Sequence, residues 1–118
     1  MAQGSKNFAE ITGAINEGLA GLRSGAAGDA LTAFGSLAKA ATADGALDKK
    51  TKELIALAIG VAKQCDCCIG FHTKALQRLG ATDEEVAETL GMCVYMGGGP
   101  ALMYAADAWT AWQQLKSS

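Results

Sequence analysis

A chain of 118 residues predicts a single domain, because most domains contain about 100–150 residues. Hydrophobic residues make up 50% of the chain and charged residues 19%, which is typical of a globular protein and excludes a disordered one. The formal net charge of -2 excludes a broad basic surface, so we expect neither nucleic acid nor a membrane as a partner. Many alanines, few β-branched residues and 1 proline favour an all-α fold.

The first part of the chain predicts two amphipathic helices. In residues 8–22, apolar side chains recur every three or four positions and so form one helical stripe. A second stripe follows the glycine-containing break at residues 25–28 and ends at the Asp-Gly turn signal of residues 44–45. We expect Asp29 to cap this second helix. The polar residues 1–7 precede the first helix, and we expect them to be disordered.

Asp48 opens a third helix, in which residues 54–62 carry no charge on any face. A helix that is apolar all round is expected to be buried on all sides. In so short a chain, this implies burial between subunits as well as within one, and it predicts a cyclic or dihedral homo-oligomer. The charge-free stretch is far shorter than the ~20 residues that span a bilayer, and no secretory signal is visible. We therefore expect a cytoplasmic protein.

Three further helices are expected after a break near residues 64–66. The first ends at Gly80, since glycine suits the position just past a helix. Thr82 and Glu85 form a capping box for the second. Three glycines then interrupt the pattern, and Pro100 suits the first turn of the last helix. No segment alternates apolar and polar residues for long enough to predict a strand, so the prediction is a bundle of six helices.

The segment from Cys65 to His72 concentrates the reactive side chains. On a helix, Cys65, Cys68 and His72 fall within an arc of about 60°, whereas Cys67 points to the opposite half. Two thiols at this spacing near a helix start can close and reopen a disulfide, because the helix dipole and the exposed amides stabilise a thiolate. His72 can take or relay the thiol proton. A dithiol peroxidase or a disulfide reductase needs two such thiols and a group that moves their protons.

Other interpretations of these residues stay open. One is a zinc site built from Cys65, Cys68, His72 and either Glu53 or Cys67. Structural zinc sites usually draw their ligands from two separated knuckles, however, and there is no second Cys-x-x-Cys pair. Cys93 lies on an apolar stripe and is expected to be inert core packing, while Cys67 is either a small buried side chain or a bystander thiol. Glu53 is either a solvated partner of the helix dipole or a partly buried proton acceptor.

Four motifs occur together in the second half of the chain. They are Lys52-Glu53-Leu54, Cys65-x-x-Cys68-x-x-x-His72, Gly80-Ala81-Thr82-x-Glu84-Glu85 and Met96-Gly97-Gly98-Gly99-Pro100. In this combination they resemble the AhpD-like group of the carboxymuconolactone decarboxylase family, over roughly residues 46–106. The resemblance implies all-α subunits assembled into trimers or hexamers. It also implies an alkylhydroperoxidase with no bound cofactor, which takes electrons from a lipoyl-type or thioredoxin-like dithiol carrier.

The resemblance also implies a role for each site residue. Cys68 would be oxidised to a sulfenic acid, and Cys65 would be the resolving partner and proton donor that closes the disulfide. Glu53 and His72 would form a proton relay, through a water, that activates the thiol. Where a well-known peroxidase of the family has an assisting histidine, this chain has Cys67, a third thiol that can compete for disulfide pairing.

Three alternative functions remain at this point. A lactone decarboxylase, after the family's name, needs acid and base groups and an anion pocket but has no use for a resolving thiol. A general disulfide reductase would use the same dithiol on another oxidant. A zinc-stabilised structural oligomer would have no catalytic role for these residues, and loss of its zinc would unfold it.

Overall fold

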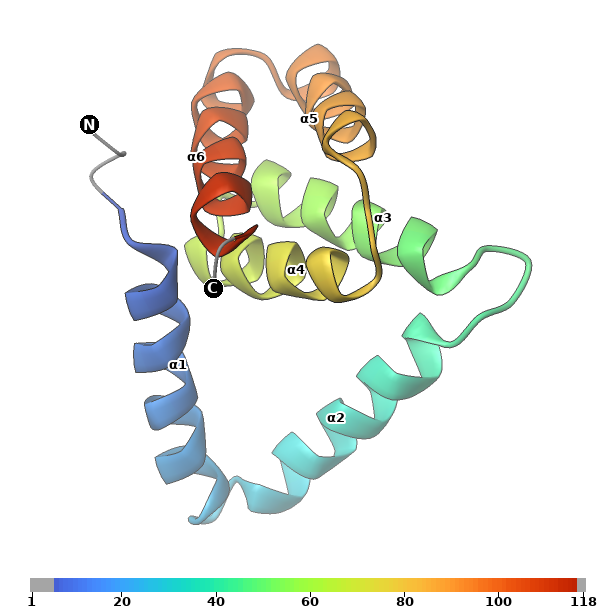
Figure 1. Cartoon of the computed structure of the whole chain (residues 1–118). Coiled ribbons are helices and arrows are strands. Elements are labelled where there is room, and N and C mark those ends of the chain that lie inside the picture. The colour runs from blue at the N-terminus through green and yellow to red at the C-terminus, as the bar shows by residue number, and fades with distance from the viewer. Residues whose placement is uncertain (1–5, 117–118) are drawn as a thin grey trace.

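In the computed structural model, residues 6–116 form six α-helices with no strand among them, which confirms the all-α prediction (Figure 1). The helices are α1 Phe8–Arg23, α2 Gly28–Thr42, α3 Lys49–Ala62, α4 Asp66–Arg78, α5 Asp83–Gly97 and α6 Gly99–Lys116. Helices α3 to α6 pack into a body, and the N-terminal end of α1 rests against it. The rest of α1 and the whole of α2 project from this body, and we call this part the arm.

Two helix starts follow from the capping residues that the sequence shows. The Asp48 carboxylate accepts a hydrogen bond from the Thr51 amide at 2.8 Å, so it caps α3 as predicted. Thr82 and Glu85 form the predicted capping box of α5, with bonds of 2.9 and 3.1 Å in the two directions. These local signals therefore fix where α3 and α5 begin.

The predicted cap of the second helix is wrong. The N-cap of α2 is Ala27, whose side chain makes no capping hydrogen bond, and Asp29 lies inside the first turn. Hydrogen-bonded turns at residues 24–27 lead directly into α2, which therefore starts one residue before Asp29. The negative charge still complements the positive end of the helix dipole.

The core lies among α3 to α6 and takes in the start of α1. Its large, fully buried side chains are Phe8, Leu57, Ile69, Leu76, Trp112 and Leu115. Gly70 is the point where α1 meets α4, because a Cβ there would lie 2.5 Å from the Thr12 Cγ2 atom. The missing side chain lets the two helices approach closely.

The residues just before α1 are anchored. Asn7 caps α1, and the Lys6 ammonium forms ion pairs with Asp66 at 2.9 Å and Asp107 at 2.6 Å. Gln114 also bonds to the Lys6 carbonyl at 2.9 Å. The expected disorder is therefore wrong for residues 6 and 7, because these contacts tie them to the body. Residues 1–5 of the same segment lie outside the described residues.

Helix α3 is buried on one face only. Glu53 and Leu57 point into the body, whereas Ile55 and Ile59 remain 44% and 52% exposed. Burial on all sides is therefore wrong for the single chain, because the other helices cover just one face of α3. Among residues 6–116, no helix is both long and apolar enough to cross a membrane.

Candidate functional site

A disulfide joins Cys65 and Cys68 at the N-terminal end of α4, with the two Cα atoms 5.3 Å apart. Cys65 is the N-cap of α4 and has an extended backbone, so it precedes the helix on which the sequence analysis placed it. Its Sγ atom accepts a hydrogen bond from the Cys68 amide at 3.2 Å. Once the disulfide is reduced, this amide and the dipole of α4 stabilise negative charge on the Cys65 sulfur.

A tight connection between α3 and α4 places the two cysteines. Gln64 adopts a left-handed backbone with φ 58°, and the Cys65 amide bonds back to the Gly60 carbonyl at 3.0 Å. A Cβ at Gly60 would lie 3.0 Å from the Cys68 Cβ atom. Glycine at this position therefore lets Cys68 pack directly against α3. The result is a hairpin of two helices with the disulfide at its closed end.

Glu53 and His72 meet between the same two helices. The His72 Nδ1 atom lies 2.7 Å from Glu53 Oε1, and the Glu53 residue is only 8% exposed. The burial expected in one of the two interpretations of Glu53 is confirmed. A carboxylate bound to one ring nitrogen fixes the tautomer of the imidazole and leaves Nε2 to take or give a proton. The His72 side chain is 32% exposed, so a proton can also reach solvent.

The four predicted site residues thus share one interface. Glu53 lies two helical turns before Gly60 on α3, and His72 lies about one turn after Cys68 on α4. Because the two helices form a hairpin, the carboxylate and imidazole follow the disulfide along the α3 and α4 contact. The structure therefore places a redox pair at the start of α4 and an acid–base pair farther along, between α3 and α4.

Lys6 lies close to the candidate site, and the sequence analysis did not identify it. Its ammonium bonds to Asp66, the residue directly after Cys65, and to Asp107 on α6. It also lies 4.8 Å from the centre of the Tyr104 ring. Hydrogen bonds to Asp107 and then to Asp66 raise the pKa of Lys6 well above its ordinary value, so it stays charged. No local pattern reveals a pairing that spans 60 residues.

The other two thiols differ in environment. Cys67 is free and half-buried, and it directly precedes Cys68 in the chain. Cys93 is 8% exposed in the core, and burial raises the pKa of its thiol. Its predicted place in the core is confirmed. Within residues 6–116, no group of three His, Cys, Asp or Glu side chains has a geometry that could hold a metal ion, and the zinc alternative finds no support there.

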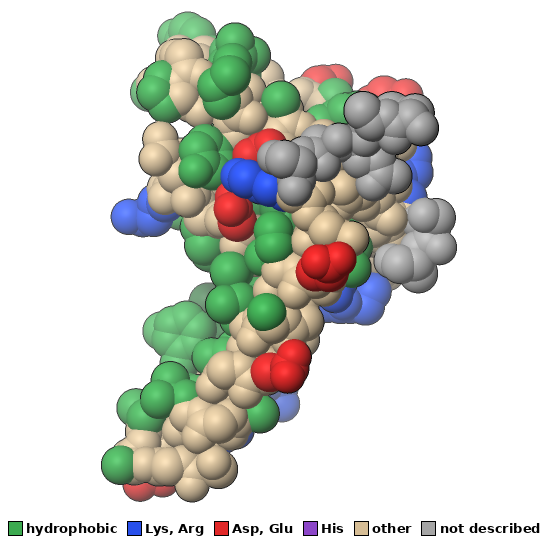
Figure 2. Space-filling view, turned by 90° about the vertical axis from the view of Figure 1, so that its left-hand side faces the viewer, with side chains coloured by type: hydrophobic (Ala, Val, Ile, Leu, Met, Phe, Trp, Pro, Cys, Tyr) green, Lys and Arg blue, Asp and Glu red, His purple; other side chains and the backbone are tan. Residues whose placement is uncertain are grey.

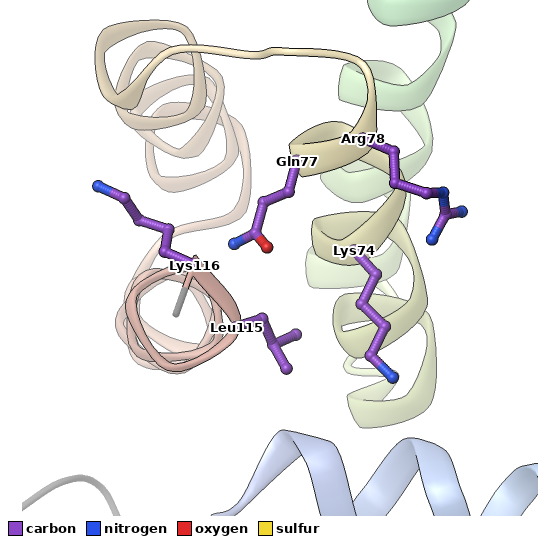
Figure 3. Close-up of a pocket in the computed structure, with 5 residues that line it drawn as sticks. All are labelled: Lys74, Gln77, Arg78, Leu115 and Lys116. Atoms are coloured by element: carbon purple, nitrogen blue, oxygen red, sulfur yellow. The ribbon is translucent and has the colours of Figure 1, made fainter. Parts of the chain in front are cut away.

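A hollow of about 340 Å³ between α4 and α6 is rimmed by cations (Figure 3). The charged tips of Lys74, Arg78 and Lys116 point in different directions and do not converge on one point. Lys74 already bonds to the Thr12 hydroxyl at 2.9 Å, and Lys116 bonds to Asp83 at 2.9 Å. This arrangement is not built to hold an anion, so the disulfide and the Glu53–His72 pair remain the candidate site.

A second hollow of about 370 Å³, which we call the outer groove, lies between α3 and α5. It is lined by Ile55, Ala58, Ile59, Ala62, Met92, Cys93, Met96 and Gly97. Its α3 residues lie on the opposite side of that helix from Glu53 and Gly60. The outer groove is therefore separated from the disulfide by α3 itself.

Comparison with known proteins identifies the group to which this fold and site belong. The model of the carboxymuconolactone decarboxylase family matches residues 28–111. The chain belongs to the carboxymuconolactone decarboxylase family. An uncharacterized protein of Cupriavidus necator is 51% identical over 79 residues, which are 67% of this chain and 70% of the relative.

Two crystal structures of family members extend the likeness to nearly the whole chain. A carboxymuconolactone decarboxylase family protein from Legionella pneumophila, solved in its apo form, is 59% identical, covers 92% of this chain and 96% of its own, and has a TM-score of 0.90. A family protein of Thermotoga maritima, described as "possibly involved in antioxidative response", is 30% identical with a TM-score of 0.74. That match covers 95% of this chain and 92% of the relative. The predicted family is confirmed.

Proposed function

We propose that this family member reduces alkyl hydroperoxides with the Cys65–Cys68 dithiol. The observation that carries the proposal is the disulfide at the start of α4, which is the oxidised end state of such a reaction. Both cysteines of the disulfide are half-buried, so a small peroxide can reach sulfur. Glu53 and His72 lie along the same helix pair and supply the acid–base groups that the reaction needs.

The reaction has two steps on the protein. The Cys68 thiolate attacks the terminal oxygen of the hydroperoxide, the O–O bond breaks, and the alkoxide takes a proton to leave as an alcohol. Cys68 is then a sulfenic acid. The Cys65 sulfur attacks it, the disulfide closes, and the hydroxyl group leaves as water. Two electrons and two protons pass from the dithiol to the peroxide.

The Glu53–His72 pair manages these protons. In our proposal His72 Nε2 removes the Cys68 proton, directly or through a water, while Glu53 holds Nδ1–H and stabilises the imidazolium that forms. The same proton is then available to the departing alkoxide. Cys65 acts as the resolving partner and proton donor, and the Cys68 amide favours its thiolate when it attacks the sulfenic acid.

An external dithiol completes the cycle. Its thiolate attacks the Cys68 sulfur, and Cys65 leaves as the better-stabilised thiolate because its sulfur receives the Cys68 amide hydrogen bond. The second thiol of the carrier then attacks the mixed disulfide and restores both protein thiols. One hydroperoxide and one dithiol thus give one alcohol, one water and one oxidised carrier. A lipoyl-type or thioredoxin-like carrier fits this chemistry.

Cysteine variants test the proposal. We expect Cys68→Ser and Cys65→Ser to abolish steady-state consumption of cumene hydroperoxide with dihydrolipoamide as reductant. We expect Cys67→Ser and Cys93→Ser, the matched controls, to keep it within about threefold of wild type, since neither thiol is in the disulfide. Full activity in Cys68→Ser, or loss in Cys67→Ser alone, would contradict the proposal. A lactone-converting activity that survives the Cys65→Ser/Cys68→Ser double variant would indicate a decarboxylase.

A general disulfide reductase is the second candidate, because an N-cap cysteine that accepts an amide hydrogen bond suits attack on disulfides as well. The choice of oxidant separates the two. A peroxidase turns over faster with cumene hydroperoxide than with oxidised glutathione at equal concentration. A disulfide reductase shows the reverse order, with the same dependence on Cys65 and Cys68.

A further inference from the structure

Gln64, the residue before Cys65, has a backbone conformation that its side chain disfavours. Its φ angle is 58°, and between residues 6 and 116 it is the one residue other than glycine with a positive φ angle. A left-handed backbone brings the Cβ atom too close to the following carbonyl oxygen, a cost that glycine does not have. The Gln64 side chain is exposed, so packing does not offset this cost.

The end of α4 shows that the same position suits glycine. The left-handed residue is Gln64 after α3 and Gly80, with a φ angle of 75°, after α4. At each helix end, the amide of this residue bonds to the carbonyl three residues before it, at 3.1 and 3.2 Å respectively. The amide of the next residue bonds to the carbonyl five residues before it, at 3.0 Å in both places. Both ends are therefore Schellman motifs, and the strained version is the one beside the disulfide.

Several contacts hold the backbone around Cys65 in place. The Cys65 amide belongs to the motif that ends α3, and its carbonyl accepts a hydrogen bond from the Ile69 amide at 3.0 Å. Its neighbour Asp66 binds the Lys6 ammonium at 2.9 Å, on the side of the body where Figure 2 shows acidic and basic side chains gathered. The disulfide to Cys68 is the tie that opens and closes in the proposed cycle. A strained backbone persists where such ties over-determine it.

We propose that Gln64 is a positioning residue that keeps the Cys65–Cys68 disulfide easy to reduce. This inference rests on the proposed function, in which an external dithiol reopens the disulfide in every cycle. The closed disulfide fixes Cys65 against the start of α4 and so helps to hold Gln64 in its left-handed conformation. Reduction removes this tie and lets Gln64 relax part of its strain, which favours the dithiol form. A glycine at this position would make no such contribution.

The reductive half of the cycle is where this contribution matters. Oxidation by a hydroperoxide breaks a weak O–O bond and is strongly favourable without help from the backbone. Reduction by a carrier exchanges one disulfide for another, so a small difference in stability between the two decides its equilibrium. Strain at Gln64 therefore acts on the step that has the smaller driving force.

Redox equilibria with dithiothreitol test the role of Gln64. Two electrons and two protons pass from dithiothreitol to the two sulfurs, and the dithiothreitol closes into its own cyclic disulfide. We expect Gln64→Gly to shift this equilibrium toward the protein disulfide by about three- to tenfold, because glycine has no strain to release. A tenfold shift corresponds to about 30 mV. Alkylation of free thiols followed by peptide mapping measures the fraction of the Cys65–Cys68 disulfide at each ratio of reduced to oxidised dithiothreitol.

Two further variants separate strain at Gln64 from other effects. Gln64→Ala removes the amide group but keeps the Cβ atom, so its equilibrium should lie within about twofold of wild type. Gly80→Ala is the matched control, because it introduces the same left-handed strain at the opposite end of α4 from the disulfide. We expect Gly80→Ala to unfold at a lower urea concentration while its redox equilibrium also stays within about twofold of wild type.

Three results would overturn the proposal. One is a Gln64→Gly equilibrium that is unchanged or shifted toward the dithiol. Another is a Gln64→Ala shift as large as that of Gln64→Gly, which would assign the effect to the amide group. The third is an equal shift in Gly80→Ala, which would make it a consequence of overall stability. None of these measurements uses a peroxide, so a protein without peroxidase activity would refute the proposed function and leave this inference to be judged separately.

Discussion

At the scale of single residues, the contact between Glu53 and His72 is the most informative feature. A buried carboxylate 2.7 Å from an imidazole orients the ring and sets which ring nitrogen faces the carboxylate. The sequence placed Glu53 at the edge of a charge-free stretch but did not show whether its side chain is buried. Its hydrogen-bond partner His72 lies 19 residues away on the next helix, beyond the reach of local sequence patterns.

Glu53→Gln tests this role. The amide keeps the shape of the side chain but cannot stabilise an imidazolium, so we expect peroxide reduction to slow by about 10²–10⁴-fold, as for loss of a general acid–base group. Peroxide consumption under saturating dithiol measures the effect. Glu88→Gln, on the exposed surface of α5, should leave the rate unchanged. An unaltered rate in a folded Glu53→Gln protein would remove the carboxylate from the mechanism.

Lys6 gives a second prediction at this scale. Its pKa is raised by Asp107 and Asp66, so its stabilising effect is complete below the ordinary value of 10.5 and is lost as pH rises through the higher folded value. We expect Lys6→Met to lower the free energy of unfolding at pH 7 by about 0.5–1 kcal/mol, measured in urea. The gap from wild type should shrink above pH 10.5. Lys39→Met on α2 is the control, and an equal loss there would contradict this account.

Lys6→Met also bears on the thiols. Without the ammonium, the charge of Asp66 acts uncompensated on the adjacent Cys65. Alkylation of the Cys65 thiol by iodoacetamide at pH 7 should therefore slow, which peptide mapping in the reduced Cys67→Ser/Cys68→Ser background can follow. An alkylation rate that Lys6→Met leaves unchanged or raises would show that the ammonium does not act on the dithiol.

At the scale of elements, local chemistry predicted where α3 and α5 begin. The sequence predicts these caps because each is a hydrogen bond between residues three positions apart: Asp48 with Thr51, and Thr82 with Glu85. The cap predicted at Asp29 was wrong because α2 begins at Gly28, so that Asp29 lies inside its first turn. The one-sided burial of α3 was not readable, because it depends on how the neighbouring helices are arranged.

The meeting of α1 and α4 at Gly70 supplies a prediction for these elements. An alanine there would place its Cβ 2.5 Å from Thr12 Cγ2, so we expect Gly70→Ala to destabilise the protein by about 1–2 kcal/mol despite its better helix propensity. Gly91→Ala is the matched control, since its Cβ meets nothing within 4 Å on α5. It should be neutral or stabilising by up to ~1 kcal/mol. Equal effects in urea unfolding would contradict the close packing at Gly70.

At the scale of the whole molecule, the candidate site lies within one pair of helices. Glu53, Cys65, Cys68 and His72 all come from α3, α4 and their connection in one chain. The outer groove lies elsewhere, with α3 between it and the disulfide. Substitutions of these four residues therefore test the redox chemistry without altering the outer groove.

The most direct test of the redox proposal is peptide mapping of fully reduced wild type after one equivalent of cumene hydroperoxide. We predict the loss of two thiols per chain, one cumyl alcohol per disulfide formed, and a single crosslinked pair, Cys65 with Cys68. Four intact thiols in a folded protein, or a disulfide that includes Cys67 or Cys93 in their place, would contradict it.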